Sequence, residues 1–286
     1  MVDLLIDKHG PPLYVRHHIV HNDHVVKRLE GRGAIFVEDI RLVPDGSRVV
    51  FSAHGSSPSL YRAAKKRRLQ IIDATCPLVA KVHLEAVRYA SEGYFIFYIG
   101  HKGHPETIGV LGEVSRGQIV LIETVADVLL ARPQSDKLVI LNQTTLGVDD
   151  TKKIIEALKE RFPDVIVPAG KDICYATQNR QDAVKALAKV VDLITVVGSP
   201  ASSNSSRLRQ VAEEQGVKAY LINGKEEIDP AWLKGVTTLG ITSGASVPEE
   251  LVTEVVLFFT RPEVEIEELK IADESQIHFA LPNENF

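Results

Sequence analysis

Cysteine is scarce in this sequence, which holds two, Cys76 and Cys174, among 286 residues. Two cysteines without a secretory signal argue against a disulfide scaffold and favour a reducing compartment. Neither belongs to a C-x-x-C pair, so a zinc ribbon and a thioredoxin-like motif are excluded. The two thiols are therefore available as ligands or nucleophiles, or else they are inert buried cysteines, and composition alone does not decide between these.

Long apolar runs and a charge excess of one sign are also absent. No run approaches the roughly 20 apolar residues that a membrane span requires, and the first residues lack the basic, apolar and small-residue succession of a signal peptide. The 33 basic and 38 acidic residues give a net charge of -5, which indicates neither a nucleic-acid surface nor a polybasic membrane patch. We therefore expect a cytoplasmic protein that acts on a small molecule, with no nucleic-acid or membrane partner.

What the sequence does contain is a recurring unit, in which a short apolar β-branched run is followed by a polar loop and an amphipathic helix. The apolar runs are residues 49–51, 71–72, 95–99, 138–141, 193–197 and 239–242. Such repetition predicts parallel sheets covered by helices, divided among two or three domains. No G-x-x-x-x-G-K-[ST] motif occurs, and no G-x-G-x-x-G follows a strand, so a nucleotide ligand is not expected.

The polar loops are expected to converge on one ligand site, because ligands bind outside the carboxyl ends of parallel strands. Amphipathic spacing predicts helices over residues 151–161 and 181–190. Residues 2–11 have the pattern of a helix end, with a basic last turn, Gly10 as the stop and Pro11 beyond. No strand precedes that helix, so we expect the first domain to be truncated at its front.

Several loop residues are candidates for binding an anion such as a diphosphate ester. The histidines are His21, His54 and His104, and the other polar residues are Ser202, Ser203, Asn204 and Ser246. Histidines can donate to phosphate, and hydroxyls, amides and backbone N–H groups at helix starts can surround its oxygens. The alternatives are ordinary surface histidines and simple helix N-caps.

Glu106 and the two cysteines are candidates for catalysis and metal binding. Glu106 follows the phosphate-loop candidate His104, where a carboxylate would repel the ligand unless it transferred a proton. The alternative is a solvated surface glutamate. Cys76 precedes Pro77 at an apparent helix start, and Cys174 lies near a predicted strand-to-helix turn, where the helix dipole favours a thiolate.

A set of motifs, in order along nearly the whole chain, resembles one enzyme family. The motifs are residues 14–17 with 20–22, 51–55, 73–77, 100–106, 143–145, 172–177, and 197–199 with 202–205. Together they closely resemble the 4-hydroxy-3-methylbut-2-enyl diphosphate reductases, the LytB family. The ordered set is far more specific than any single loop.

The resemblance implies an α/β fold of three similar small parallel-sheet domains with flanking helices around a central cavity, the first domain being truncated. The expected division is 1–76, 77–173 and 174–260, with a carboxyl-terminal tail over 261–286. The family opens with a strand and a Gly-Phe-Cys loop that carries the first cluster cysteine, and this sequence has no match to that segment.

The implied activity is reductive dehydroxylation of 4-hydroxy-3-methylbut-2-enyl diphosphate to isopentenyl and dimethylallyl diphosphate, the last step of non-mevalonate isoprenoid biosynthesis. The resemblance implies an oxygen-sensitive 4Fe-4S cluster held by three cysteines, of which Cys76 and Cys174 match two, with an open iron that binds the substrate hydroxyl. Electrons would come from ferredoxin or flavodoxin.

The resemblance also assigns roles to the candidate residues. His21, His54, His104, Ser202, Ser203, Asn204 and Ser246 would hold the diphosphate, while Glu106 and Thr144, with His104, would serve the catalytic proton transfer. The alternative is a cluster-deficient, non-enzymatic diphosphate-binding homologue. A phosphatase-like hydrolase is a weaker option, because no metal-binding carboxylate cluster accompanies the histidines.

Overall fold

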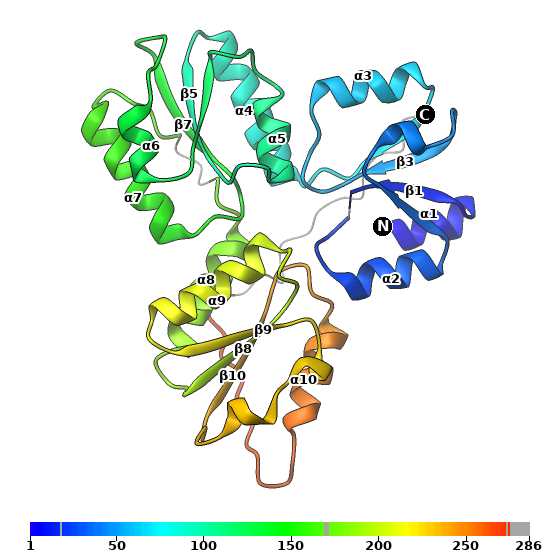
Figure 1. Cartoon of the computed structure of the whole chain (residues 1–286), viewed down its shortest axis with the longest axis vertical. Helices are drawn as coiled ribbons and strands as arrows, with labels where there is room; N and C mark the ends of the chain where they lie inside the picture. Colours follow the sequence, from blue (N-terminus) through cyan, green and yellow to red (C-terminus); the bar gives the residue numbers. More distant parts are fainter. Residues whose placement is uncertain (18, 169–171, 273, 275–286) are drawn as a thin grey trace. The chain divides into compact units, whose positions relative to one another are not determined.

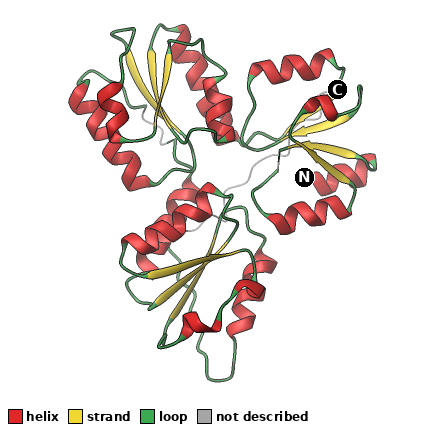
Figure 2. Ribbon diagram, in the orientation of Figure 1, coloured by secondary structure: helices red, strands yellow, loops and turns green. Residues whose placement is uncertain are grey.

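The computed structural model describes residues 1–17, 19–168, 172–272 and 274 of the chain (Figure 1). Among these residues, ten strands form three separate sheets, and all paired strands run parallel. Helices flank each sheet, as Figure 2 shows. The expected α/β fold of small parallel sheets with flanking helices is thereby confirmed. Within the described part, every helix is too short or too polar to cross a bilayer.

The first sheet has the strand order β2-β1-β3-β4. Its strands are β1 (Leu13–Arg16), β2 (Ala34–Val37), β3 (Arg48–Phe51) and β4 (Gln70–Asp73), and its helices are α1 (Val2–His9), α2 (Asp23–Gly31), α3 (Pro58–Lys66) and the short 3-10 helix η1 (Ile40–Leu42). Val49 and Phe51 alternate along β3 and pack with Ala64 of α3 in one core cluster. Helix α1 ends at Gly10 with φ 73°, as its sequence predicts.

The second sheet has the order β6-β5-β7, and its central strand is buried on both faces. Its strands are β5 (Phe95–Ile99), β6 (Ile119–Ile122) and β7 (Leu138–Asn142), and its helices are α4 (Pro77–Ser91), α5 (Pro105–Leu111), α6 (Val125–Leu130) and α7 (Val148–Arg161). Phe97 of β5 packs toward α6 and α7, whereas its neighbour Tyr98 packs toward α4 and α5. A strand that helices cover on both faces needs an unbroken apolar run, and this explains the sequence over 95–99.

The third sheet has the order β10-β8-β9. Its strands are β8 (Leu193–Val197), β9 (Lys218–Ile222) and β10 (Leu239–Ser243), and its helices are α8 (Tyr175–Leu187), α9 (Ser203–Glu214), α10 (Glu249–Phe259), η2 (Lys225–Glu227) and η3 (Pro230–Leu233). Val196 packs in a cluster with residues of α8 and α9, whereas Val197 packs with residues of α10. Each fully buried aliphatic side chain of this kind stabilises the fold by roughly 1.5–3 kcal/mol.

Chain contacts divide the protein into two compact units. The first contains the described residues of 1–19 and 27–174, and therefore the first two sheets. The second contains residues 20–26 and the described residues from 175 onward, with the third sheet.

Two helix boundaries differ from those expected. The helix predicted over 151–161 begins earlier, at Val148, and the one predicted over 181–190 runs from Tyr175 to Leu187. Apolar spacing places the second helix too late because its first turns bury polar side chains, Thr177 and Gln181, which the hydrophobic pattern does not register.

Candidate functional site

Glu106 is buried at the start of helix α5, at the carboxyl end of the second sheet. Glu106 is only 1% exposed. Thr144, just beyond β7, donates from its backbone N to Oε1 at 2.8 Å and from its Oγ1 to Oε2 at 2.9 Å. Burial raises the pKa of Glu106 to about 7, although the hydrogen bonds from Thr144 oppose that rise. The alternative that Glu106 is a solvated surface residue is therefore wrong, and its carboxyl can hold or release a proton near neutral pH.

His104 is the N-cap of the same helix. Its Nδ1 accepts a hydrogen bond from the backbone N of Glu106 at 3.2 Å. A ring that accepts at Nδ1 carries its proton on Nε2 when it is neutral. The His104 ring meets the ring of His54 edge-on, with centroids 5.8 Å apart. His54 follows β3 in a turn where the hydroxyl of Ser52 lies 3.2 Å from its Nδ1.

The buried side chain of Gln143, the residue before Thr144, connects two loops of the site. The side chain of Gln143 accepts from the backbone N of His101 at 3.0 Å and from the hydroxyl of Thr107 at 3.2 Å. This amide therefore joins the loops that follow β5 and β7.

Asp172 is a second support for the same loop. Its Oδ2 accepts from the backbone N of Asn142 at 3.1 Å, and its Oδ1 pairs with the ammonium of Lys81 at 3.0 Å. Burial raises the pKa of Asp172, while the ion pair with Lys81 favours its charged form.

The two cysteines lie at helix starts near these loops. Cys76 is the N-cap of α4, and its backbone N donates to the carbonyl of Ala53 at 3.0 Å. Cys174 directly precedes α8, and its backbone N donates to the carbonyl of Thr144 at 2.9 Å. Both are free cysteines of intermediate exposure, so neither is fully buried. No strand directly precedes Cys174 among the described residues, where a strand-to-helix turn was expected.

In the second unit, hydroxyl and amide side chains cluster at the start of helix α9. Ser202 is the N-cap and accepts from the backbone N of Ser205 at 3.3 Å. Asn204 is 6% exposed, and neither polar atom of its side chain has a hydrogen-bond partner among the described residues. Buried amides without hydrogen-bond partners are rare. A ligand bound at this helix start would supply partners for the Asn204 side chain.

Two glycines allow strand ends to approach this helix. A Cβ at Gly198 would lie 2.3 Å from the hydroxyl oxygen of Ser205, and one at Gly244 would lie 2.1 Å from it. The turn that carries Ser246 begins at Gly244, so this close approach brings that turn toward the start of α9.

The predicted residues are therefore distributed over the two units. In the first unit, hydrogen bonds and ring contacts link His54, His104, Glu106 and Thr144, and the backbone of Cys174 joins them. In the second unit, Ser202, Ser203 and Asn204 share the start of α9, and Ser246 follows β10. His21, just before α2, belongs to this unit by its contacts.

Comparison with known proteins agrees with these features. The family model described as "LytB protein" matches residues 1–260. The chain belongs to the LytB family. The 4-hydroxy-3-methylbut-2-enyl diphosphate reductase 2 of Burkholderia mallei is 53% identical over 257 residues, which cover 90% of this chain and 78% of that protein. The 4-hydroxy-3-methylbut-2-enyl diphosphate reductase of Alcanivorax borkumensis is 49% identical over 287 residues, covering 99% and 92%.

Solved structures of the same enzyme also match. The E-1-hydroxy-2-methyl-but-2-enyl-4-diphosphate reductase from Plasmodium falciparum superposes with a TM-score of 0.89 at 42% identity, covering 92% of this chain and 82% of that one. A second structure, titled (E)-4-hydroxy-3-methyl-but-2-enyl diphosphate reductase, the terminal enzyme of the non-mevalonate pathway, matches with a TM-score of 0.65 at 32% identity over 90% of each chain.

LytB proteins are iron-sulfur enzymes, but the residues present here do not complete the ligand set of a cluster. The thiols of Cys76 and Cys174 are of the right kind, since iron-sulfur clusters are held by thiolates. Across the described ranges, no three His, Cys, Asp or Glu side chains are grouped to hold a metal.

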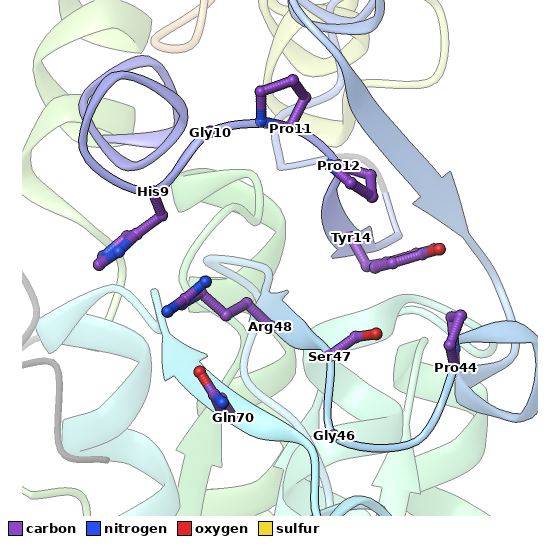
Figure 3. A pocket seen from close by; sticks show the side chains of 10 residues that line it. All are labelled: His9, Gly10, Pro11, Pro12, Tyr14, Pro44, Gly46, Ser47, Arg48 and Gln70. Carbon is purple, nitrogen blue, oxygen red and sulfur yellow. The ribbon is translucent and has the colours of Figure 1, made fainter.

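A cavity of about 330 Å³ lies in the first unit (Figure 3). It is lined by His9 at the end of helix α1 and by residues at the starting ends of β1, β3 and β4, among them Arg48 and Gln70. None of the predicted site residues lines it. In parallel sheets the ligand end is the carboxyl end of the strands, so we assign this cavity no part in the site.

Sequence reasoning gave no role to Gln143, Asp172 or Lys81. Lys81 and Asp172 are 91 residues apart, so no local pattern could pair them. The one available signal was a polar Asn-Gln-Thr-Thr run directly after a buried strand, a position where polar side chains need partners.

The raised pKa of Glu106 predicts a pH-dependent gain in stability for Glu106→Gln. Because the folded-state pKa lies above the unfolded value near 4.5, the folded protein binds the proton more tightly, and its free energy of unfolding falls as the pH rises toward about 7. Glutamine does not titrate and can keep both contacts with Thr144, accepting from its N and donating to its Oγ1.

Denaturant unfolding of both proteins at pH 5 and pH 8 measures the effect. The difference in free energy of unfolding should move in favour of the variant between these pH values, by up to about 3 kcal/mol. Glu160→Gln, at an exposed position of α7, is the control and should show no such trend. An equal pH dependence for Glu106→Gln and the unsubstituted protein would contradict the raised pKa.

Proposed function

We propose that this protein reduces 4-hydroxy-3-methylbut-2-enyl diphosphate to isopentenyl and dimethylallyl diphosphate, the last step of non-mevalonate isoprenoid biosynthesis. Replacing the hydroxyl by hydrogen takes two electrons and two protons and releases water. The observation that carries the proposal is Glu106, a buried carboxyl with a pKa of about 7, held against Thr144 and next to His104. Family membership supports the same reaction.

Within this proposal, Glu106 and Thr144 deliver the proton with which the hydroxyl leaves. With its pKa raised to about 7 by burial, Glu106 can give up a proton and regain it near neutral pH during turnover. The Oγ1 of Thr144 lies 2.9 Å from Glu106 Oε2. When Glu106 is protonated, it would donate its proton to this oxygen, while the hydroxyl proton of Thr144 turns away from Glu106 and passes to the leaving hydroxyl of the substrate. His104 holds the start of α5, where its Nδ1 accepts from the backbone N of Glu106.

We propose that two sets of residues contact the diphosphate. In the first unit these are His54 and His104, whose rings meet, and in the second they are His21, Ser202, Ser203, Asn204 and Ser246. The first set supplies imidazole donors. The second supplies hydroxyls, the buried amide of Asn204 and the N–H groups at the start of α9, where the helix dipole favours an anion.

The proposed reaction calls for a 4Fe-4S cluster, to which Cys76 and Cys174 would give two thiolates, although the described residues do not complete its ligand set. When bound, the cluster supplies the electrons, received from ferredoxin or flavodoxin. Two free cysteines suit a reducing, cytoplasmic location. The division into domains 1–76, 77–173 and 174–260 with a tail over 261–286 also stays a proposal, and each of these three domains contains one sheet.

Pyrophosphate binding tests the two sets of anion-binding residues. We expect millimolar pyrophosphate to raise the melting temperature by a few degrees, because a ligand at ten times its Kd stabilises the folded state by about 1.4 kcal/mol. The rise should shrink in His54→Ala and, separately, in Asn204→Ala, which remove one group from each set.

His24→Ala, at an exposed histidine of α2 outside both sets, is the control and should keep the full rise. Absence of any rise at millimolar pyrophosphate would count against both sets. A rise that survives one substitution unchanged would remove that residue from the proposal.

A further inference from the structure

His83 is a buried histidine that none of the functions above uses. It lies on helix α4 and is 8% exposed. Its Nδ1 lies 2.8 Å from Oε1 of Glu113, just beyond the end of α5. With Nδ1 donating to that carboxylate, a neutral ring keeps Nε2 as an acceptor. Nε2 is buried and has no hydrogen-bond partner among the residues that the structure describes.

The far edge of the His83 ring lies against two glycines. A Cβ at Gly55 would lie 2.6 Å from Nε2, and one at Gly109 would lie 2.9 Å from Cε1 and 3.0 Å from Nε2. Real Cβ atoms do not approach so closely, so both positions admit the ring because they are glycines. At Gly55 the positive φ of 77° also favours glycine.

Gly109 is the more informative of the two. It lies within helix α5 and its backbone needs no positive φ. Glycine inside a helix costs about 1 kcal/mol relative to alanine, and a close neighbour gives a structural reason for it here. That neighbour is the His83 ring.

The two glycines belong to the segments that carry the proposed anion-binding and proton-transfer groups. Gly55 directly follows His54, and Gly109 is three residues beyond Glu106 in α5. A Cβ on Gly109 would also lie 3.6 Å from the carbonyl carbon of Gly55, so the two segments approach each other at the ring. The hydrogen bond to Glu113 fixes the ring in this space.

We propose that His83 is a positioning residue, whose imidazole fills the space between Gly55 and Gly109 and thereby sets the distance between the His54 turn and helix α5. Its effect on ligand binding rests on the proposed function, whereas its effect on the two segments does not. His83 acts through His54 and His104 and touches no reacting atom.

A volume exchange between His83 and Gly109 tests the proposal. His83→Asn keeps an amide that can donate to Glu113 but empties the space beside the glycines. Gly109→Ala places a methyl group in that space while the ring is present. In the double variant, the methyl group occupies the space that the ring has left, so the two defects should offset each other.

The first measurement is the imidazole resonances of His54 and His104 in 13C-labelled protein. These rings meet edge-on, so a change in the spacing of their segments should shift both resonances. We expect clear shifts in each single variant and near-native positions in the double variant. Leu84→Ala, at an exposed position next to His83 on α4, should shift neither.

The second measurement is pyrophosphate affinity. Each single variant should bind about tenfold more weakly, and the double variant should return to within about twofold of the unsubstituted protein. If the two losses multiply in the double variant, or if the single variants leave the resonances unshifted, the proposal is overturned.

The two measurements separate this inference from the proposed function. If the unsubstituted protein does not bind pyrophosphate, the proposed anion-binding roles fail, while the resonances still decide the role of His83. If His83→Asn does not fold, the resonances and the pyrophosphate affinity of Gly109→Ala alone decide whether His83 sets the spacing. If Gly109→Ala raises the melting temperature and leaves the resonances of His54 and His104 unshifted, the added methyl group meets no ring, and the proposed position of His83 is excluded.

Discussion

Glu106→Gln is expected to lower turnover by about 10²–10⁴-fold while leaving substrate affinity intact or improved. The amide of glutamine is not acidic enough to transfer a proton, so the leaving hydroxyl of the substrate loses its proton donor. The substitution also removes a negative charge close to the bound diphosphate, so the affinity for substrate should not fall. In the unsubstituted enzyme, kcat should decrease as the pH rises above about 7, because the donor must be protonated.

The measurement is anaerobic steady-state kinetics with a chemical one-electron reductant. It uses a form of the protein extended ahead of Met1 by the strand and Gly-Phe-Cys loop of the LytB family, so that a third cysteine is present. His104→Ala is the contrasting variant, and it should raise the apparent Kd because it removes a phosphate donor. Near-normal turnover by Glu106→Gln would refute the proton-transfer role.

Iron-sulfur content should differ between the present sequence and the extended form. After anaerobic reconstitution, we expect the 286-residue protein to retain well under the four irons and four sulfides of a complete cluster, because two thiolates leave at least one iron without its protein ligand. The extended form should approach a complete cluster, and Cys76→Ser or Cys174→Ser in that form should again lose it.

Iron and sulfide analysis with the visible absorption spectrum measures this result. Leu84→Ala in the extended form is the control and should retain its cluster. A stable, stoichiometric 4Fe-4S spectrum from the 286-residue protein would point to a ligand other than cysteine. Retention of the cluster in Cys76→Ser would remove Cys76 from the ligand set.

Much of the candidate site could be proposed from the sequence because its residues lie in loops directly after strands. The His54 turn follows β3, Thr144 follows β7, and the serines of α9 follow β8. These strands belong to three different sheets, and in each parallel sheet ligands bind at the loops that follow the carboxyl ends of the strands, so sequence position alone indicates their use. Their local order along the chain also carries the resemblance to the LytB family.

The protonation of Glu106 could not be predicted in this way. From the sequence, a solvated surface glutamate was the alternative, because a carboxylate in a polar loop is most often exposed. Burial of Glu106 depends on Thr144, which is 38 residues away. A pKa responds to the solvent and partners around the group, and these are set only when distant segments meet.

The sequence by itself determined the fold class, the polar loops and the family, because apolar periodicity and short motifs are local properties of the chain. Tertiary structure alone decided which residues work together. It buried Glu106 against Thr144, paired Lys81 with Asp172, and placed the His83 ring between Gly55 and Gly109. Each of these contacts joins residues about 25 to 90 positions apart, and such pairs form only when helices and strands pack together.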